Sequence, residues 1–200
     1  MDKPYSAACD RNKEFILTEL RAVLSPQDQR VLEIGAGTGQ HAVFFAEHFP
    51  FLEWVVSDKI SQHPGIRQWL ADSHVPISGP LEYEIGKTEF PPGHFDITFC
   101  ANVLHIISWQ EFVQLAADLG QNLKKSARSV FYWPFFISSQ TTAASNLEFD
   151  NWLKKNTQSG GIRWLENVVK IMEENNFALV HSEPMPANNQ LLVFKKTSNQ

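Results

Sequence analysis

The residues best suited to bind a ligand form the stretch Val31-Leu32-Glu33-Ile34-Gly35-Ala36-Gly37-Thr38-Gly39-Gln40-His41. An apolar strand runs into three alternating glycines, and an amphipathic helix follows at once. Glycine adopts positive φ and lets a ligand approach the backbone closely. Gln40 stands where the dinucleotide fingerprint G-x-G-x-x-G requires its third glycine, and the sequence lacks the Gly-Lys-Ser/Thr of a phosphate-binding P-loop. The stretch therefore predicts a site for a nucleoside that carries no phosphate group in need of its own binding loop. Glu33 is expected at the mouth of this site, where it would hold an amine or a hydroxyl.

A second acidic residue extends this pattern. The segment 53–58 is typical of the next strand and ends in Asp58. This carboxylate follows the glycines by about twenty residues, the spacing at which a strand-end acid meets ribose hydroxyls. A ligand-free glycine turn and an exposed loop aspartate are the alternative interpretation, but the two features in register favour a nucleoside. S-adenosylmethionine fits this pattern.

Polar residues that follow the later strands are candidates for acid–base chemistry. His105 has an intrinsic pKa suited to proton transfer near neutrality, and it follows a predicted buried strand over 95–101. The alternative is a histidine packed in the core, since no partner acid is evident. Asn102 either holds a polar group of a substrate or caps a turn. Histidine, cysteine and carboxylate residues form no ligand-spaced cluster, so we expect no metal.

The elements that must position these residues alternate between strands and helices. Strands are expected at 30–34, 53–58, 81–85, 95–101 and 129–133, and helices at 11–24, 39–48, 65–72, 109–123, 146–155 and 163–175. Two final strands, 178–182 and 190–195, are joined by a short loop and should pair antiparallel. The predicted fold class is therefore α/β, Rossmann-like and doubly wound, with a mainly parallel seven-stranded sheet and a C-terminal antiparallel hairpin.

Composition limits the function classes further. The 200 residues, 43% of them hydrophobic, suit one domain over 1–200. A net charge of −5 with scattered Lys and Arg argues against DNA as a partner. Cys9 and Cys100 suggest no disulfide framework, and no signal peptide or membrane-length apolar run is present. We therefore expect a cytoplasmic protein that does not enter a membrane; the sequence leaves its oligomeric state open.

Several segments together resemble one protein family. They are Arg11-Asn12-Lys13-Glu14, Gly39-Gln40-His41-Ala42, Ser57-Asp58, Cys100-Ala101-Asn102-Val103-Leu104-His105-Ile106, Ser145-Asn146, Phe149-Asp150, Gly161-Ile162-Arg163 and Met185-Pro186-Ala187-Asn188-Asn189. The chain resembles the class I S-adenosylmethionine-dependent methyltransferases over nearly its whole length. Within them it is similar to a methyltransferase-like group catalogued as a domain of unknown function.

The resemblance implies two sets of site residues. The cofactor S-adenosylmethionine would be bound by Glu33, Gly35, Gly37, Gly39, His41, Asp58, Glu84, Ile85 and Ala101. Glu84 stands where the group carries an aspartate and would accept from the adenine amino group. The substrate would meet Arg11, Asn12, Trp133, Phe135, Asn146, Asn188 and Asn189, beside the catalytic candidates His105 and Asn102. Trp133 replaces a glycine of the group and would narrow the substrate mouth, and residues 1–25 would form a helical lid.

The sequence thus predicts an S-adenosylmethionine-dependent methyltransferase that acts on a small polar molecule or a peptide group. The alternative is a subunit that binds the cofactor, is catalytically weak and serves protein interaction.

Overall fold

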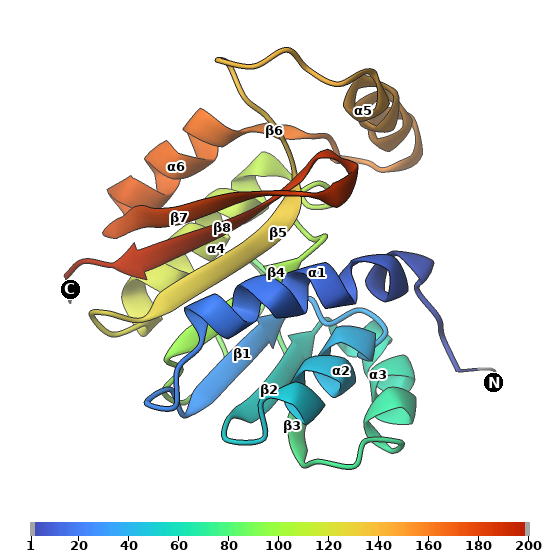
Figure 1. Ribbon diagram of the computed structural model, residues 1–200, viewed down its shortest axis with the longest axis vertical. Coiled ribbons are helices and arrows are strands. Elements are labelled where there is room, and N and C mark those ends of the chain that lie inside the picture. The colour runs from blue at the N-terminus through green and yellow to red at the C-terminus, as the bar shows by residue number, and fades with distance from the viewer. Residues whose placement is uncertain (1–2, 199–200) are drawn as a thin grey trace. The chain divides into compact units, whose positions relative to one another are not determined.

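The computed structural model describes residues 3–198 of the chain (Figure 1). The chain forms two compact units, with the boundary between Cys100 and Ala101, and each unit is described by itself. Among the described residues, no helix is both long and apolar enough to cross a membrane. One domain over 1–200 stays a prediction, and its terminal residues 1–2 and 199–200 lie outside the described part.

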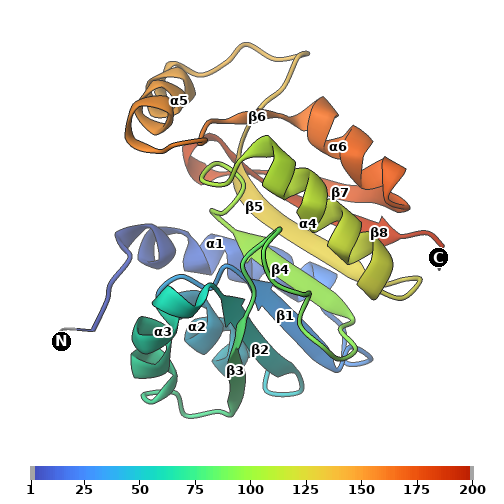
Figure 2. The same cartoon turned by 180° about the vertical axis from the view of Figure 1, so that it is seen from behind.

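The first unit is a parallel α/β layer. Its elements are α1 (Ala7–Val23), β1 (Arg30–Ile34), α2 (Gln40–His48), β2 (Glu53–Asp58), a 3₁₀ turn η1 (Ile60–Gln62), α3 (His63–Leu70), β3 (Ile77–Glu82) and β4 (Ile97–Ala101). The strands pair in the order β3-β2-β1-β4, and every pairing is parallel. Helices α1 and α2 cover one face of this sheet (Figures 1 and 2).

Apolar burial explains why these segments form this layer. Strands β1, β2 and β4 read as near-continuous buried runs, as expected of parallel strands that are covered on their faces. The rings of Phe45, Trp54 and Phe99 pack within 6.0 Å of one another and are fully buried. Phe45 thus packs α2 against the buried faces of β2 and β4 in the core of the first unit.

One strand differs from its predicted position. The sequence placed it at 81–85, whereas β3 runs from Ile77 to Glu82 and residues 83–85 lie beyond its end. The strand contains Gly79 and Pro80, which normally argue against a strand interior. Proline is tolerated here because β3 pairs on one side only, with β2.

The second unit combines helices with antiparallel strands. Its elements are α4 (Trp109–Asn122), β5 (Arg128–Phe136), α5 (Ala144–Asn156), β6 (Arg163–Trp164), α6 (Leu165–Glu174), β7 (Phe177–Met185), a 3₁₀ turn η2 (Pro186–Asn188) and β8 (Asn189–Lys196). Strand β8 pairs antiparallel with both β5 and β7, and β6 pairs parallel with β5. Helices α4 and α6 cover one face of these strands (Figures 1 and 2).

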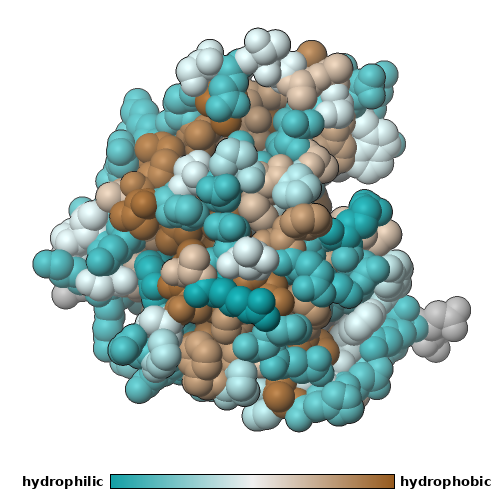
Figure 3. Space-filling view, in the orientation of Figure 1, coloured by the Kyte–Doolittle hydropathy of each residue, from teal (hydrophilic) through white to brown (hydrophobic). Residues whose placement is uncertain are grey.

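A buried lysine ties this unit together. The Lys196 ammonium donates to the carbonyls of Gly120 and Asn175 at 2.7 and 3.0 Å, near the ends of α4 and α6. A cation satisfies the carbonyls that a helix leaves unpaired at its C-terminus. In Figure 3, apolar side chains gather over β7, where Val180 is half-exposed.

The α/β, Rossmann-like class is confirmed, with parallel strands in the first unit and the antiparallel C-terminal hairpin in the second. The predicted helix over 163–175 begins at Leu165 instead, because residues 163–164 pair with Phe135 and Phe136 as β6. The other predicted elements are present, with ends shifted by a few residues.

Candidate functional site

The glycine stretch forms a tight turn between β1 and α2. Gly35, Gly37 and Gly39 have φ values of 72°, 58° and 89°, all in the left-handed region that favours glycine. The amides of Gly35 and Ala36 both donate to the carbonyl of Ser57, at 3.0 and 3.1 Å. The turn is thus fixed to the end of the neighbouring strand β2, and its backbone would be strained with most other residue types.

Open space lies beside the middle glycine. A Cβ built on Gly37 would meet no atom within 4 Å, whereas one on Gly39 would lie 3.3 Å from the Cβ of Trp69 and 3.4 Å from the backbone of Ile66. Gly39 is therefore needed for packing against α3, while Gly37 borders an accessible space. A ligand could approach the backbone at Gly37.

Asp58 lies at the same turn. Its carboxylate accepts from the amides of Gly37 and Lys59, each at 2.7 Å. Burial raises the pKa of the Asp58 carboxyl, while these two amide bonds act in the opposite direction. Each oxygen keeps a further lone pair for a donor, because a carboxylate accepts about four hydrogen bonds. The side chain is held rigidly and still has capacity for hydroxyl groups of a ligand.

Glu33 occupies a different environment from the predicted mouth. It is 2% exposed, and its Oε2 accepts from the indole Nε1 of Trp54 at 2.7 Å. Burial raises the pKa of Glu33 to about 8, against the effect of the Trp54 bond. The carboxyl is therefore mostly protonated near neutral pH and can donate as well as accept. Its predicted contact with a ligand stays a prediction.

His41 and Asn12 connect the two helices that cover the sheet. The Nε2 of His41 lies 2.8 Å from Oδ1 of Asn12, and both side chains are buried. Burial lowers the pKa of His41 to about 4, so its ring is neutral near pH 7 and carries one proton, on one of its two nitrogens. Arg11, the neighbouring substrate candidate, is exposed.

Gln40 has a role that the sequence did not indicate. Its side chain accepts from the amide of Ser6 and from the hydroxyl of Thr38, and its Nε2 donates to the carbonyl of Ser6 at 3.3 Å. Ser6 is the N-cap of α1. The residue that replaces the third glycine of the dinucleotide pattern therefore fixes the start of α1 to the glycine turn. The proposed lid over 1–25 stays a prediction, and its residues 1–2 lie outside the described part.

The remaining cofactor candidates lie at strand ends. Glu84 is partly exposed beyond β3, and its Oε1 pairs with the Lys87 ammonium at 2.5 Å. Ile85 is buried, and Ala101 is the last residue of β4. Neither Glu84 nor Ile85 makes a described contact with the glycine turn.

In the second unit, the chain turns sharply as it leaves β4. Asn102 has a φ of 59°, and its amide donates to the carbonyl of Tyr132 at 2.9 Å. An asparagine is one of the few residue types that adopt this conformation readily. The turn directs the chain towards His105.

His105 is buried and electrostatically unfavourable for protonation. Burial, together with the nearby Arg163 guanidinium, lowers the pKa of His105 to about 4. The ring packs edge-to-face on Phe149 at 5.4 Å, and its Nδ1 has no partner in the described structure. A neutral imidazole with so low a pKa is a weak proton acceptor near pH 7.

Trp133 and Phe135 project from β5. Both are buried, their ring centroids are 5.7 Å apart, and the Nε1 of Trp133 has no partner in the described structure. Phe135 also lines a pocket, whereas Trp133 does not.

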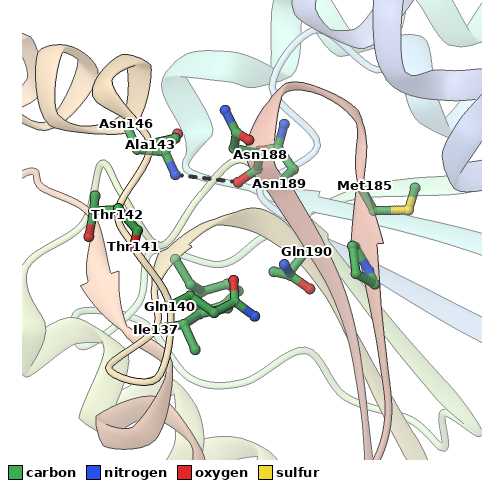
Figure 4. Close-up of a pocket in the computed structure, with 12 residues that line it drawn as sticks. Ile137, Gln140, Thr141, Thr142, Ala143, Asn146, Met185, Asn188, Asn189 and Gln190 are labelled. Carbon is green, nitrogen blue, oxygen red and sulfur yellow. Dashed lines mark hydrogen bonds between the residues drawn. The ribbon is translucent and has the colours of Figure 1, made fainter.

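This pocket brings four of the predicted substrate residues together (Figure 4). It has a volume of about 200 Å³ and is lined by Phe135, Ile137, Gln140, Thr141, Thr142, Ala143, Asn146, Pro184, Met185, Asn188, Asn189 and Gln190. Phe135, Asn146, Asn188 and Asn189 were predicted, whereas Asn102, His105 and Trp133 are not in the lining. Gln140, Thr141 and Thr142 were not predicted, although a polar run directly after a buried strand is a signal for such a loop.

Structural comparison places the fold in a large group. The protein is similar to an O-methyltransferase family protein from Burkholderia thailandensis, with a TM-score of 0.79 and 13% identity over 96% of this chain and 58% of that one. It is also similar to human N-acetylserotonin methyltransferase in complex with SAM, with a TM-score of 0.79 and 15% identity over 96% and 53% of the two chains.

A third structure, an O-methyltransferase family 2 protein from Planctomyces limnophilus in complex with apigenin, gives a TM-score of 0.76 and 17% identity over 92% and 62% of the two chains. The chain thus spans between about half and three-fifths of the length of these proteins. At these identities the likeness shows a shared fold.

Comparison with protein families is more specific. Residues 3–196 match the family described as "Protein of unknown function (DUF938)". The match covers nearly the whole chain, and the chain therefore belongs to this family.

Proposed function

We propose that this protein is a methyltransferase that uses S-adenosylmethionine and acts on a small polar acceptor. The observation that carries the proposal is the turn at Gly37, where the half-buried Asp58 holds the backbone beside open space. The fold is shared with proteins whose structures contain the same cofactor, which supports this choice of ligand.

The residues of the first unit suit a nucleoside. The Asp58 carboxylate has lone pairs left for the two ribose hydroxyls, and a charge-assisted bond of this kind is about twice as strong as a neutral one. Glu84 offers a carboxylate for the adenine amino group, because Lys87 pairs with Oε1 alone and a carboxylate accepts about four hydrogen bonds. The missing Cβ of Gly37 leaves the backbone open to close approach.

When bound, the cofactor supplies an activated methyl group, so the protein's task is to bind and orient. His105 is neutral at physiological pH and offers an unpartnered Nδ1. It is therefore better suited to bind the acceptor by a hydrogen bond than to remove a proton from it. An acceptor that is already nucleophilic needs no strong base. Asn102, held by its left-handed backbone, is the second candidate for orienting the acceptor.

The direct test of cofactor binding is isothermal titration calorimetry with S-adenosylhomocysteine. Asp58→Asn should weaken binding by about 10- to 100-fold, because a hydrogen bond to a charged group contributes about 1.5–3 kcal/mol. Glu47→Gln removes a carboxylate from the exposed far end of α2 and should bind like the wild type.

A second variant protects the test against a folding defect. Glu84→Ala changes a partly exposed side chain and should also weaken binding, with an unchanged melting temperature of the free protein. If S-adenosylhomocysteine does not bind the wild type, or if both variants bind as the wild type does, the proposed cofactor site is wrong. Stabilisation by NAD instead would indicate a dehydrogenase.

One observation favours a second function. The low pKa of His105 and its lack of an acid partner suit a cofactor-binding subunit that is catalytically weak. The two functions differ in turnover. With S-adenosylmethionine labelled in its methyl group and a cell extract as the source of acceptors, an enzyme transfers label into product. A protein that binds the cofactor but transfers no label would be the interaction subunit.

A further inference from the structure

The pocket of the second unit is lined by polar side chains that carry no charge. Its walls bear five carboxamides, from Gln140, Asn146, Asn188, Asn189 and Gln190, and two hydroxyls, from Thr141 and Thr142. Apolar surface comes from Phe135, Ile137 and Met185. None of the residues lining this pocket is ionisable, in a chain where 20% of all residues are Asp, Glu, Lys or Arg.

Hydrogen bonds tie the two walls of the pocket to each other. Asn188 Nδ2 donates to the hydroxyl of Ser145 at 3.0 Å. Figure 4 shows the second bond, in which Asn146 Nδ2 donates to the carbonyl of Asn188 at a longer 3.4 Å. The first wall is the start of α5, and the second is the turn between β7 and β8. Each wall therefore fixes the position of the other without using the amides of Gln140 and Gln190.

The turn is held in an unusual conformation. Ala187 and Asn188 have φ values of 58° and 57°, and Asn189 Nδ2 donates back to the carbonyl of Pro186 at 2.9 Å. Consecutive left-handed residues other than glycine are strained, and such strain persists where the surroundings impose it. Here it presents Asn188 and Asn189 together to one cavity.

From this geometry we infer that the pocket binds an uncharged molecule with both hydrogen-bond donors and acceptors, built on a single ring or a chain of similar size. Carboxamides donate and accept at once, so they match amide and hydroxyl groups. An apolar cavity of about 150 Å³ holds one benzene, and the pocket's volume of about 200 Å³ leaves room for a ring with a small polar substituent. The ligand class is inferred from the pocket alone. That this molecule is the methyl acceptor rests on the proposed function.

A charged ligand fits less well. The lining offers an ion no opposite charge and only neutral hydrogen bonds, in place of the water that the ion gives up where it contacts the pocket. The start of α5 has no side-chain cap, so its free N–H groups favour an oxygen acceptor. The partial positive charge at the start of α5 is weaker than that of a cationic side chain, so it does not compensate an anion fully. A neutral carbonyl accepts from the same N–H groups and gives up no ionic hydration.

Three probes of nearly equal shape test the charge preference. Benzamide, benzoate and benzylammonium can be titrated into ¹⁵N-labelled protein while the side-chain amide signals of the pocket are followed by NMR. We expect benzamide to bind the wild type at least about tenfold more tightly than either ion, a difference that corresponds to one unsatisfied polar contact. The signals of Gln140, Asn146 and Gln190 should move.

A charge placed in the pocket should reverse the preference. Gln190→Glu preserves shape and should bind benzylammonium about tenfold more tightly than the wild type does. Gln121→Glu adds the same charge on the exposed face of α4, outside the pocket lining, and should leave all three affinities unchanged. Equal changes in both variants would show an effect of net charge alone and would overturn the inference.

The outcomes separate this inference from the proposed function. If S-adenosylhomocysteine binds but benzamide moves none of these signals, or an ion binds the wild type as tightly as benzamide, the inference is wrong and the proposed function stands. If benzamide binds with the expected preference but S-adenosylhomocysteine does not bind, the proposed cofactor is wrong and the ligand class of the pocket stands.

Discussion

Burial holds the side chains of Glu33, His41 and His105 in their uncharged forms near neutral pH. Burial raises the pKa of Glu33 to about 8, and it lowers the pKa values of His41 and His105 to about 4. The two histidines differ in their contacts, because His41 has Asn12 as a partner and Nδ1 of His105 has none in the described structure. A buried polar atom left without a partner is the kind of group that a ligand or an ordered water satisfies.

Glu33 should make the protein less stable as the pH rises. Its folded pKa lies above the unfolded value of 4.5, so the folded state binds the proton more tightly, and stability falls between about pH 4.5 and pH 8. Glu33→Gln keeps an oxygen for Trp54 and removes this titration. We expect the free energy of unfolding of the variant to rise relative to that of the wild type between these pH values. The relative gain is at most about 5 kcal/mol, because each pKa unit corresponds to about 1.4 kcal/mol.

Urea unfolding at pH 5 and pH 8 measures this difference. Glu47→Gln, on the exposed side of α2, is the control and should follow the wild type at both pH values. A gap between Glu33→Gln and the wild type that stays constant with pH would mean that Glu33 is ionised throughout.

At the scale of elements, the turn between β1 and α2 makes different demands on its glycines. All three adopt positive φ, but only Gly39 is also packed closely, against Trp69 and Ile66 of α3. Gly37→Ala should lower the free energy of unfolding by about 1–2 kcal/mol through backbone strain alone. Gly39→Ala should lower it further, because the neighbouring α3 backbone must also shift.

Chemical denaturation of both variants, with binding of S-adenosylhomocysteine measured in parallel, separates packing from ligand access. Relative to the free energy of unfolding that each variant loses, Gly37→Ala should lose more affinity for S-adenosylhomocysteine than Gly39→Ala. The reverse order would place the open space, and with it the ligand, elsewhere on the turn.

The same turn illustrates what the sequence could predict. Glycine spacing predicted the turn, and the strand pattern predicted Asp58 at a strand end, since both follow from residue type and local order. The bond from the Gly37 amide to the Asp58 carboxylate was not predicted. The bond of Gln40 to Ser6 and that of His41 to Asn12 join segments some thirty residues apart. No local pattern indicates such pairs, because they depend on how α1 packs.

Neither the position of β3 nor the protonation state of Glu33 could be predicted from the sequence, because both depend on tertiary structure. Gly79 and Pro80 concealed β3, since an edge strand tolerates residues that a central strand excludes. Glu33 was expected at a ligand mouth because an acid after an apolar run is typical of one. Its burial and its Trp54 bond depend on tertiary packing.

The positive φ of Ala187 carries no sequence signal at all, because alanine is uncommon in that region. The polar loop that follows β5 could have been found, whereas its convergence with the turn at Asn188 required the fold of the second unit.

At the scale of the whole molecule, charge bears on the class of partner. The chain carries 17 Lys and Arg against 22 Asp and Glu, for a net charge of −5. Proteins bind duplex DNA chiefly by neutralising phosphates with clustered cations, and their affinity falls steeply with salt. An acidic chain with scattered cations lacks this source of free energy, and the charge-free pocket at Asn146 and Gln190 offers phosphate no counter-charge.

We therefore expect no measurable binding of a short fluorescein-labelled DNA duplex at protein concentrations up to about 10 μM and about 50 mM salt, a range in which DNA-binding proteins do bind non-specifically. Fluorescence polarisation measures this directly. The companion experiment uses methyl-labelled S-adenosylmethionine with extract separated into DNA, protein and small-molecule fractions, and label should enter the small-molecule fraction. Salt-sensitive binding of the duplex, or label in the DNA fraction, would contradict the assignment, because either would require a cationic surface that the composition does not provide.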